Sequence, residues 1–471
     1  MKASDLAPRY DVAVIGAGPA GLAAASLTAR AGLTTLLIDE NPGIGGQIYR
    51  GIGSTPVAVQ ATLGADYWAG STLADELASS GAVIATGTTV WSLDAERRIG
   101  VSMAGEARMI EARYVVLATG ALERPFAIPG WTLPGVMTIG GAQTLLKAHG
   151  LVPEGRVVLA GCGPLLWLYA AQLLRAGGAI DAIIDTTPRG NWLKAALWAP
   201  SFALSRYFGK GLALMREVRR KTRLFRAEWL EAIGDANKLT EVAFGTAGQE
   251  RRLPADRLLL HHGVVPNLNL AAAAGIAPAW DARQHCWVVP AGDKFAALTS
   301  GIAVAGDAAG IGGAEAAAER GRLAALAIVE VLRPAAMPSL PRERSVRRAL
   351  RRALRGRRFL DALFLPAPQF RRPMGDTMVC RCEEVTAEQI RGAANLGVPG
   401  PNQMKAFLRC GMGPCQGRMC GLTVTELIAA ERGIHPRDVG YWRLRPPVKP
   451  ITLGELASLP VSEAERVAVE R

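Results

Sequence analysis

Cysteines gathered near the C-terminus are the residues of this sequence whose spacing most directly suggests chemistry. Five of the seven cysteines lie in the 41 residues from Cys380 to Cys420. The N-terminal residues run into an apolar strand without a signal region, so we expect a cytoplasmic protein. Because disulfides are rare in the cytosol, this clustering predicts metal-binding thiolates in place of a disulfide framework.

The spacing of these cysteines indicates which kind of metal centre they could bind. Cys380 and Cys382 form a C-x-C pair; Cys415 follows after 32 intervening residues, and Cys420 after four more. This arrangement resembles the helical [2Fe–2S] module of bacterioferritin-associated ferredoxin, from which it departs by a wider final pair and by the additional Cys410. The resemblance implies Cys380, Cys382, Cys415 and Cys420 as ligands of a two-iron cluster, in which each iron takes two thiolates. A four-thiolate zinc site is the main alternative, and Cys410 in place of Cys415 or Cys420 remains open.

A glycine-rich turn near the N-terminus predicts a second kind of chemistry, the binding of a dinucleotide. The apolar run 12–15 is typical of a buried parallel strand and leads into Gly16, Gly18 and Gly21 in G-x-G-x-x-G register. Gly16 permits the tight turn, Gly18 lets the backbone approach a pyrophosphate, and Gly21 lets the following helix pack closely on the strand. The N-terminus of that helix, near Pro19, presents free N–H groups to the phosphates.

Further motifs of the same kind follow along the chain. A second apolar run ends in Asp39 and Glu40, where an acidic side chain would accept ribose hydroxyls. The segments YVVLATG (114–120) and GIAVAGDAAG (301–310) end in small-residue turns. Together these motifs resemble the glutathione-reductase-like flavoproteins and imply an α/β fold with two dinucleotide-binding domains and FAD in an extended pose. The residues expected to contact FAD are Gly16, Gly18, Pro19, Ala20, Gly21, Asp39, Glu40, Gly46, Gln47, Val90, Ala118, Thr119, Gly120, Gly306 and Asp307.

The dinucleotide pattern repeats in the middle of the chain. The strand-like segment 155–160 leads into Gly161 and Gly163, and a later apolar run ends in Asp185, but Leu166 stands where the third glycine is expected. We expect a nucleotide-binding domain in which Gly161, Gly163 and Asp185 contact NAD or another adenine nucleotide, and an empty site is an open alternative. Asp185 disfavours the 2′-phosphate of NADP.

Two further observations argue against assigning catalytic side chains in the two nucleotide-binding domains. His261 and His262 end an apolar run, where histidines are more often structural hydrogen-bonding groups than acid–base catalysts. No C-x-x-C or C-x-x-x-x-C pair follows the first glycine turn, so the dithiol of a disulfide reductase is missing. No side chain is therefore assigned as a catalytic base.

Composition bounds the function further. The 471 residues are 49% hydrophobic and 20% charged, as expected for several packed domains. The net charge of +13 is concentrated in 342–358, where nine arginines accompany one glutamate and apolar residues recur at helical spacing. A solvated linker helix is the favoured interpretation, with an anionic membrane surface or an acidic partner subunit as alternatives. We expect no membrane span and, without an aromatic platform, no nucleic-acid partner.

The order of the motifs predicts the domain organisation. We expect an FAD domain (1–122 and 290–332), an inserted nucleotide domain (123–289), a basic helical linker (333–375), a mainly helical [2Fe–2S] domain (376–440) and a tail (441–471). This order resembles the larger flavoprotein subunit, the α subunit, of opine oxidases, hydrogen cyanide synthase and D-hydroxyproline dehydrogenase.

The resemblance implies an electron-transferring subunit of a complex that oxidises an amino acid or secondary amine at its C–N bond, beside a smaller FAD-containing β subunit. It leaves open a small ferredoxin-like γ subunit, an FMN at a subunit interface, and peripheral contact with the respiratory chain or the inner face of the membrane. A self-sufficient NAD(P)H-dependent reductase of its own cluster or of a ferredoxin is the alternative function, which Asp185 favours and Leu166 weakens.

Overall fold

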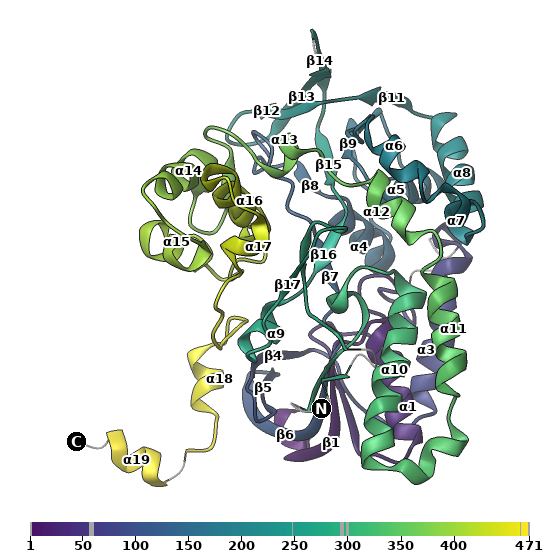
Figure 1. The fold of residues 1–471 in the computed structure, drawn as a ribbon, viewed down its shortest axis with the longest axis vertical. Coiled ribbons are helices and arrows are strands. Elements are labelled where there is room, and N and C mark those ends of the chain that lie inside the picture. The colour runs from purple at the N-terminus through teal and green to yellow at the C-terminus, as the bar shows by residue number, and fades with distance from the viewer. Residues whose placement is uncertain are drawn as a thin grey trace.

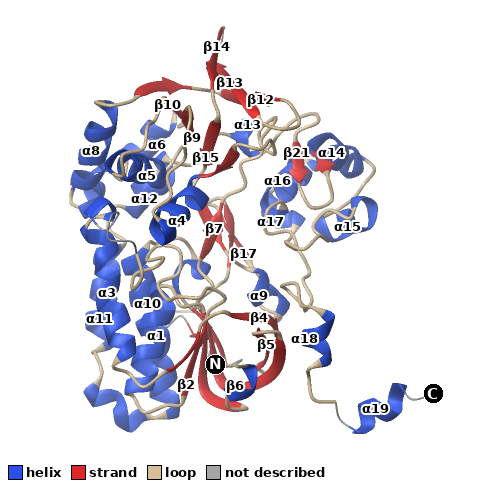
Figure 2. Cartoon of the chain, turned by 180° about the vertical axis from the view of Figure 1, so that it is seen from behind, coloured by secondary structure: helices blue, strands red, loops and turns tan. Residues whose placement is uncertain are grey.

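The computed structural model describes residues 2–55, 61–246, 248–292, 296–297, 301–461 and 463–469. Figure 1 shows a lower lobe that contains the N-terminal sheet, an upper lobe built from the middle of the chain, and a small helical module at one side. Figure 2 shows the same three parts from behind. The mixed α/β architecture agrees with the fold class predicted from the sequence.

An eight-stranded sheet forms the lower lobe, with the order β19-β20-β6-β1-β2-β3 and β4 and β5 attached at β6. The central strand β1 pairs in parallel with β2 on one side and β6 on the other, so both of its edges are hydrogen-bonded within the sheet. Its residues from Val12 to Ile15 are buried. The strands are β1 (Arg9–Ile15), β2 (Thr35–Ile38), β3 (Val83–Ala85), β4 (Thr88–Leu93), β5 (Arg98–Met103), β6 (Glu106–Leu117), β19 (Ala296–Ala297) and β20 (Ile302–Val304).

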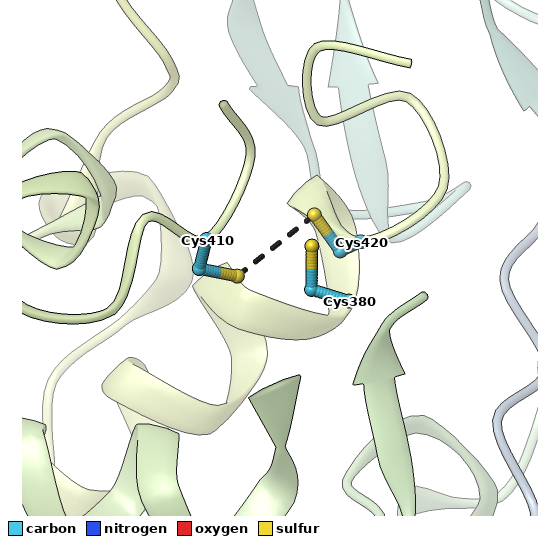
Figure 3. Close-up of side chains that lie close together, drawn as sticks. All are labelled: Cys380, Cys410 and Cys420. Carbon is cyan, nitrogen blue, oxygen red and sulfur yellow. Dashed lines mark hydrogen bonds between the residues drawn. The ribbon is translucent and has the colours of Figure 1, made fainter. Parts of the chain in front are cut away.

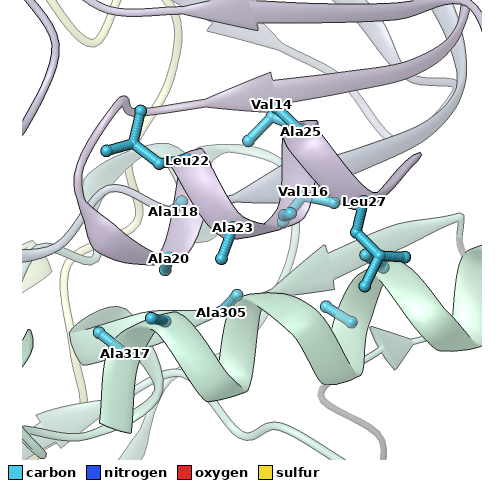
Figure 4. Close-up of a cluster of buried hydrophobic side chains, with 14 of the residues drawn as sticks. Val14, Ala20, Leu22, Ala23, Ala25, Leu27, Val116, Ala118, Ala305 and Ala317 are labelled. Carbon is cyan, nitrogen blue, oxygen red and sulfur yellow. The ribbon is translucent and has the colours of Figure 1, made fainter. Parts of the chain in front are cut away.

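Two helices lie side by side on this sheet, α1 (Pro19–Arg30) and α10 (Ala314–Leu332), and α3 (Ala65–Ala78) packs beside α1. Figure 4 shows alanines along the line where α1 meets α10. The approach is close because small residues face each other: a Cβ on Gly321 would lie 2.1 Å from the carbonyl oxygen of Ala20. Short 3₁₀ turns lie at Ala3–Asp5 and at Gly306–Ala309, before α10.

The upper lobe contains a five-stranded parallel sheet with the order β11-β10-β9-β15-β8, an antiparallel sheet of three strands, and the helices α4 (Ile139–His149) and α5 (Pro164–Arg175). The parallel strands are β8 (Val136–Thr138), β9 (Val157–Gly161), β10 (Ala182–Asp185), β11 (Arg223–Arg226) and β15 (Arg257–His261). The antiparallel strands are β12 (Trp229–Gly234), β13 (Leu239–Thr246) and β14 (Gln249–Pro254). Between the lobes lie the pairs β7 (Ala121–Glu123) with β16 (Val264–Pro266) and β17 (Ala279–Asp281) with β18 (Cys286–Val288), together with α9 (Asn269–Ala273).

Helices α6 (Asn191–Ala196), α7 (Ala199–Ala203) and α8 (Arg206–Arg219) form the insertion between β10 and β11. After α10 the chain passes through a 3₁₀ turn (Pro334–Ser339), α11 (Glu343–Ala353), α12 (Arg357–Leu363) and α13 (Pro368–Arg371). The amphipathic basic helix predicted from the sequence is α11, and its apolar side chains Val346 and Leu350 pack into the same core as α10.

The C-terminal module is mainly helical, as predicted. It comprises β21 (Met378–Cys380), β22 (Val385–Thr386), α14 (Ala387–Asn395), α15 (Pro401–Leu408), α16 (Gly421–Arg432) and α17 (Pro436–Val439), and the tail carries α18 (Leu453–Ala457) and α19 (Glu463–Val469). Thr386 and Gln389 form a capping box at the start of α14. Within the described ranges, every helix is too short or too polar to cross a bilayer.

Candidate functional site

The first glycine turn has the geometry that a dinucleotide requires. Gly16 has a φ of +108°, and a Cβ on it would lie 2.3 Å from the carbonyl oxygen of Ala118. A Cβ on Gly21 would lie 1.7 Å from the carbonyl oxygen of Gly16, so α1 can begin this close to β1 only with glycine there. Gly18 is half-buried, and the nearest atom to a Cβ built on it is 3.8 Å away, in Gly46. The turn therefore leaves an open side at Gly18, where the N–H groups of Ala20 and Gly21 have no acceptor within the helix.

The acid after β2 organises this turn. Asp39 is buried, and its Oδ2 accepts a hydrogen bond of 2.6 Å from the backbone N–H of Ala17. Its Oδ1 accepts two from Asn41, and a carboxylate still has room for a ribose hydroxyl. Glu40 instead forms an ion pair of 2.6 Å with Lys449 of the tail. Of the two predicted ribose acids, Asp39 is the one in contact with the glycine turn.

A loop folds over the turn, and a buried lysine holds it there. The backbone N–H of Gly45 donates to the carbonyl oxygen of Ala17, and a Cβ on Gly46 would lie 2.8 Å from the Cα of Gly18. Lys147 of α4 donates to the carbonyl oxygens of Gln47 and Ile48, at 3.1 and 2.9 Å, and to the side chain of Gln143. Burial lowers the pKa of Lys147 to about 7. Lys147 was not identified from the sequence, because nothing near it marks it as different from a surface lysine.

The other predicted flavin residues lie around the same turn or near it. Ala118 follows β6 and donates its N–H to Ile15, and Gly306 lies against Ala20 at the start of α1. Val90, on β4, packs against the core on the other face of the sheet. The Oδ1 of Asp307 accepts hydrogen bonds from the backbone N–H groups of Gly312 and Gly313, so this carboxylate fixes the loop directly before α10, which has no side-chain cap. The open turn, its uncapped N–H groups and the buried acid fit the adenosine and pyrophosphate part of FAD.

The second glycine turn, at Gly161 and Gly163, also leads from a parallel strand into a helix, but it is buried by other residues. Gly161 and Gly163 have φ angles of +134° and +128°, and Leu166 is fully buried at the third position. A Cβ on Gly163 would lie 3.0 Å from the ring nitrogen Nε2 of His261. Both glycines are buried, whereas Gly16 and Gly18 of the first turn are half-exposed. Asp185 ends β10 as predicted, and its Oδ1 accepts the backbone N–H of Thr187.

The linker helps to close this second turn. The thiol of Cys162 lies 3.6 Å from the carbonyl oxygen of Phe364, which follows α12. The side-chain amide of Asn191 donates to the carbonyl oxygens of Leu363 and Leu365, at 3.0 and 2.8 Å. A segment some 200 residues away in the sequence thus lies on the turn between the two glycines.

The two neighbouring histidines have structural partners. Nδ1 of His261 lies 2.9 Å from Oε2 of Glu123. Nε2 of His262 lies 2.9 Å from the hydroxyl of Thr186, and its ring stacks on Phe126 with 3.4 Å between ring centroids. Complete burial lowers the pKa of His262 well below its ordinary value. These contacts agree with the structural interpretation of both residues.

The cysteines converge from three segments of the C-terminal module. Cys380 ends β21, Cys420 precedes α16, and Cys410 lies in the loop between α15 and α16. All three are buried and their sulfur atoms lie within 4.8 Å of one another, as Figure 3 shows. Sulfur ligands about 2.3 Å from a shared ion lie roughly 3.8 Å apart, and the sulfur atoms of Cys410 and Cys420 are 4.0 Å apart. The structure therefore brings Cys410, left open from the sequence, next to two of the predicted ligands.

The remaining two predicted ligands lie together beside this group. The sulfur of Cys382 accepts the backbone N–H of Cys415 and contacts its thiol, and burial raises the pKa of Cys382. Hydrogen bonds from Cys410 and Cys420, supported by the N–H groups of Gly411 and Glu383, lower the pKa of Cys380 to about 2. A deprotonated sulfur surrounded by N–H donors and further thiols fits a thiolate-bound metal centre.

Trp442 is a residue of this centre that was not recognised from the sequence. A Cβ on Gly411, Gly417 or Gly421 would lie 2.8 Å or less from its indole ring. Three of the four glycines of the motif CGMGPCQGRMCG are therefore required by the packing of this indole, and the fourth, Gly413, faces Cys382. A tryptophan 22 residues beyond Cys420 has no local pattern that would connect it to the cysteines.

A short bridge of hydrogen bonds through Asn267 and Asn269 joins the cysteine loop (410–421) to Thr119, a predicted flavin residue after β6. The hydroxyl of Thr119 donates to the carbonyl oxygen of Asn267, whose N–H donates to Gly120. Two residues further, the side chain of Asn269 donates to the carbonyl oxygen of Gln416 at 3.0 Å. Gln416 follows Cys415 directly, and Thr119 follows Ala118, whose carbonyl oxygen lies against Gly16, so the cysteine loop and the loop after β6 contact the same segment.

Comparison with known proteins identifies a matching family for each of the two parts of the chain that this bridge connects. Residues 10–328 match the pyridine nucleotide-disulphide oxidoreductase family, and residues 374–459 match the sarcosine oxidase A3 domain. Among solved structures, L-proline dehydrogenase from P. horikoshii has a TM-score of 0.71 at 19% identity, covering 95% of this chain and 79% of that one. At this identity the likeness shows the fold alone, and it confirms the predicted fold class.

Sequence relatives span almost the whole chain. An opine oxidase subunit from Agrobacterium tumefaciens is 47% identical over 97% of this chain and 93% of that protein. The hydrogen cyanide synthase subunit HcnB from Pseudomonas aeruginosa is 32% identical over 95% of this chain and 98% of that protein. These relatives confirm the resemblance stated from the motifs. The chain therefore belongs to the pyridine nucleotide-disulphide oxidoreductase family, within the group that includes these opine oxidase subunits.

Proposed function

We propose that this chain is the electron-transferring α subunit of a heteromeric dehydrogenase that oxidises an amino acid or secondary amine of opine, hydroxyproline or glycine type at its C–N bond. Its family and the opine oxidase subunits that it resembles over nearly all its length support this proposal. The partner would be a smaller FAD-containing β subunit, with a small ferredoxin-like γ subunit and an interfacial FMN in some assemblies. Electrons would leave toward the respiratory chain.

The first glycine turn would hold FAD. The N–H groups of Ala20 and Gly21 would bind the pyrophosphate, and Asp39 would accept a ribose hydroxyl while it fixes the turn through Ala17. The loop at Gly46, fixed by Lys147, would cover the nucleotide from the other side. When bound, FAD supplies the ability to take up electrons in pairs and to release them singly.

The cysteine centre would hold a [2Fe–2S] cluster on Cys380, Cys382, Cys415 and Cys420. Cys382 lies against Cys415, and Cys380 lies against Cys420, which supports this set; Cys410 likewise lies close to Cys380 and Cys420, and the resemblance to the ferredoxin module is what favours Cys415 and Cys420 as ligands. Two thiolates per iron is the ligation that a two-iron cluster needs. Backbone N–H groups at Gly411 and Glu383 would stabilise the negative charge on the sulfur of Cys380.

The observation that carries the proposal is the bridge through Asn267 and Asn269. The proposed flavin site and the proposed cluster site would both lie against this one segment of the chain, since Thr119 donates to Asn267 and Asn269 donates to Gln416. Such an arrangement suits a subunit that divides a two-electron oxidation into single-electron steps.

Purification of the full chain, alone and co-expressed with a candidate small flavoprotein subunit, tests the proposal. We expect FAD, two irons and two sulfides per chain, and dye-linked amine oxidation only in the presence of the partner. Full oxidation of imino acids by the chain alone would refute the need for a partner. A colourless chain after anaerobic preparation would refute both cofactors.

The alternative, a self-sufficient NAD(P)H-dependent reductase, would need the second glycine turn. Asp185 at the end of β10 favours it, whereas the burial of Gly161 and Gly163 beneath His261 and the linker opposes it. Anaerobic rapid mixing with NADH separates the two functions: bleaching of the flavin absorbance would support the reductase, and an unchanged spectrum is the result that we expect.

A further inference from the structure

The insertion that contains α6, α7 and α8 exposes apolar side chains that a solvated surface does not explain. Leu193, Leu197 and Leu204 are 83%, 76% and 75% exposed, and three further large side chains on the same helices are exposed as well. The apolar set is Trp192, Leu193, Leu197, Leu204, Phe208 and Leu212. Single exposed leucines are ordinary, but a contiguous group of this size marks an interaction surface.

These side chains stand on a fixed platform. Beneath them, Ala195 packs with Phe359, Leu360 and Leu363 of α12, and the rings of Phe202 and Phe359 stack at 4.1 Å. The inner sides of these helices are thus anchored in a core, on which the rings of Trp192 and Phe208 also pack, against Phe359 and Phe202. The four leucines of the set remain exposed.

The arginine helix continues this platform. A Cβ on Gly356 would lie 2.7 Å from the hydroxyl oxygen of Ser205, and the hydroxyl of Tyr207 donates to the carbonyl oxygen of Ala353. The guanidinium of Arg358 lies 4.6 Å above the ring of Trp198. Figure 1 shows α7, α8 and α11 along one edge of the molecule, and Figure 2 shows α8 and α11 along that edge from behind.

Positive charge is in excess on this edge, which α7, α8 and α11 form. The exposed arginines of 344–358 without an ion pair to any described residue are Arg344, Arg348, Arg351, Arg352, Arg355 and Arg358. The neighbouring acids are already paired: Asp66 with Arg206 and Lys210, and Glu315 with Arg206. Together the apolar set and these six arginines form what we call the apolar–basic face.

We propose that the apolar–basic face docks the chain on an anionic membrane surface, with the leucines and Trp192 between the headgroups and the arginines on the lipid phosphates. This goes beyond the redox function. Leucine and tryptophan beside unpaired arginines are typical of interfacial helices. A lipid surface is favoured over a protein partner because four of the six apolar residues are leucines, which are under-represented among the residues that dominate protein–protein binding.

Flotation of the full chain with vesicles tests the proposal. We expect binding to phosphatidylcholine vesicles that contain phosphatidylglycerol, weak binding to pure phosphatidylcholine, and loss of binding as salt rises. The triple variant Leu193→Ser, Leu197→Ser, Leu204→Ser should bind anionic vesicles at least tenfold more weakly. Replacing Arg348, Arg351 and Arg352 by glutamine should weaken binding and flatten its salt dependence.

A matched control carries Leu396→Ser and Leu453→Ser, since both leucines are more than three-quarters exposed and lie in the C-terminal part. This control should bind as the wild type does. Absence of binding to anionic vesicles, or equal binding by the triple-leucine variant, would overturn the proposal. Loss of a co-expressed small flavoprotein subunit from the triple-leucine variant, with vesicle binding unchanged, would identify the face as a subunit interface and also overturn it. Flavin and iron content of each variant reports on the redox proposal separately.

Discussion

Replacing Lys147 by methionine tests how the loop over the flavin turn is held. The ammonium group is buried and makes hydrogen bonds to Gln47, Ile48 and Gln143. Methionine has a similar length and no donor, so it removes these bonds and the buried charge together. Because methionine has a similar length, the variant removes the titrating group of Lys147 while a side chain still fills its place in the packing.

The expected effect on the free energy of unfolding follows from the change in the pKa of Lys147 on folding. Burial, with the nearby charge of Arg50, lowers the pKa of Lys147 from 10.5 to about 7. Between these values the unfolded chain binds a proton that the folded chain does not, so the free energy of unfolding rises with pH in this window. At about 1.4 kcal/mol per pH unit, the lysine makes the wild type roughly 2–3 kcal/mol more stable at pH 9 than at pH 6, with a smooth turn near pH 7. Methionine cannot titrate and lacks this gain.

Urea unfolding of the wild type and Lys147→Met at half-unit steps from pH 6 to 9 measures the difference. All other titrating groups are shared, so the difference in unfolding free energy between the two proteins should rise by about 2–3 kcal/mol across the range. Lys221→Met, at an exposed lysine, should give a curve parallel to that of the wild type. Parallel curves for Lys147→Met as well would show that Lys147 keeps its proton in the folded protein, and the reasoning would be wrong.

Three further predictions concern the two cofactor sites and the docking of the module. Gly21→Ala should abolish flavin binding, because its Cβ meets the carbonyl oxygen of Gly16, whereas Gly392→Ala, with open space around it, should keep full flavin absorbance. Cys415→Ser should lose iron and acid-labile sulfide, and Cys410→Ala should keep two irons; full iron content in the first variant would overturn the ligand set. Glu426→Gln leaves Arg371 and His285 buried without their carboxylate and should destabilise the chain by about 3 kcal/mol, measured by thermal unfolding against Glu431→Gln, whose ion pair is more exposed.

The first glycine turn could be predicted from the sequence because its constraints are local. Strand, turn and helix follow one another within some twenty residues, and Gly16 and Gly21 each answer a backbone requirement that no other residue meets. The helix over 343–353 was predictable for a similar reason, since its apolar residues recur at the period of one helix face.

Features that depend on distant segments could not be predicted. The second glycine turn carries nearly the same signal as the first, but its accessibility depends on Phe364, about 200 residues later. Lys147 and Trp442 act through contacts made only in the folded chain. Cys410 remained open because spacing along the chain does not determine which sulfurs converge from three segments.

The tail joins the cysteine module to the flavin domain. Trp442 and Leu444 belong to the core of the cysteine module, whereas Val448, a few residues later, belongs to a core of the flavin domain. Backbone and side-chain bonds reinforce the connection, since Val448 donates its N–H to Trp91 and Gln416 donates to Pro447. The proposed electron transfer between a flavin and a cluster would require a fixed and short separation, which a flexible linker would not maintain. Because residues 441–448 pack into both cores, the separation is set by the same residues that stabilise each domain, and the cysteine loop cannot move away from the flavin turn without unpacking them.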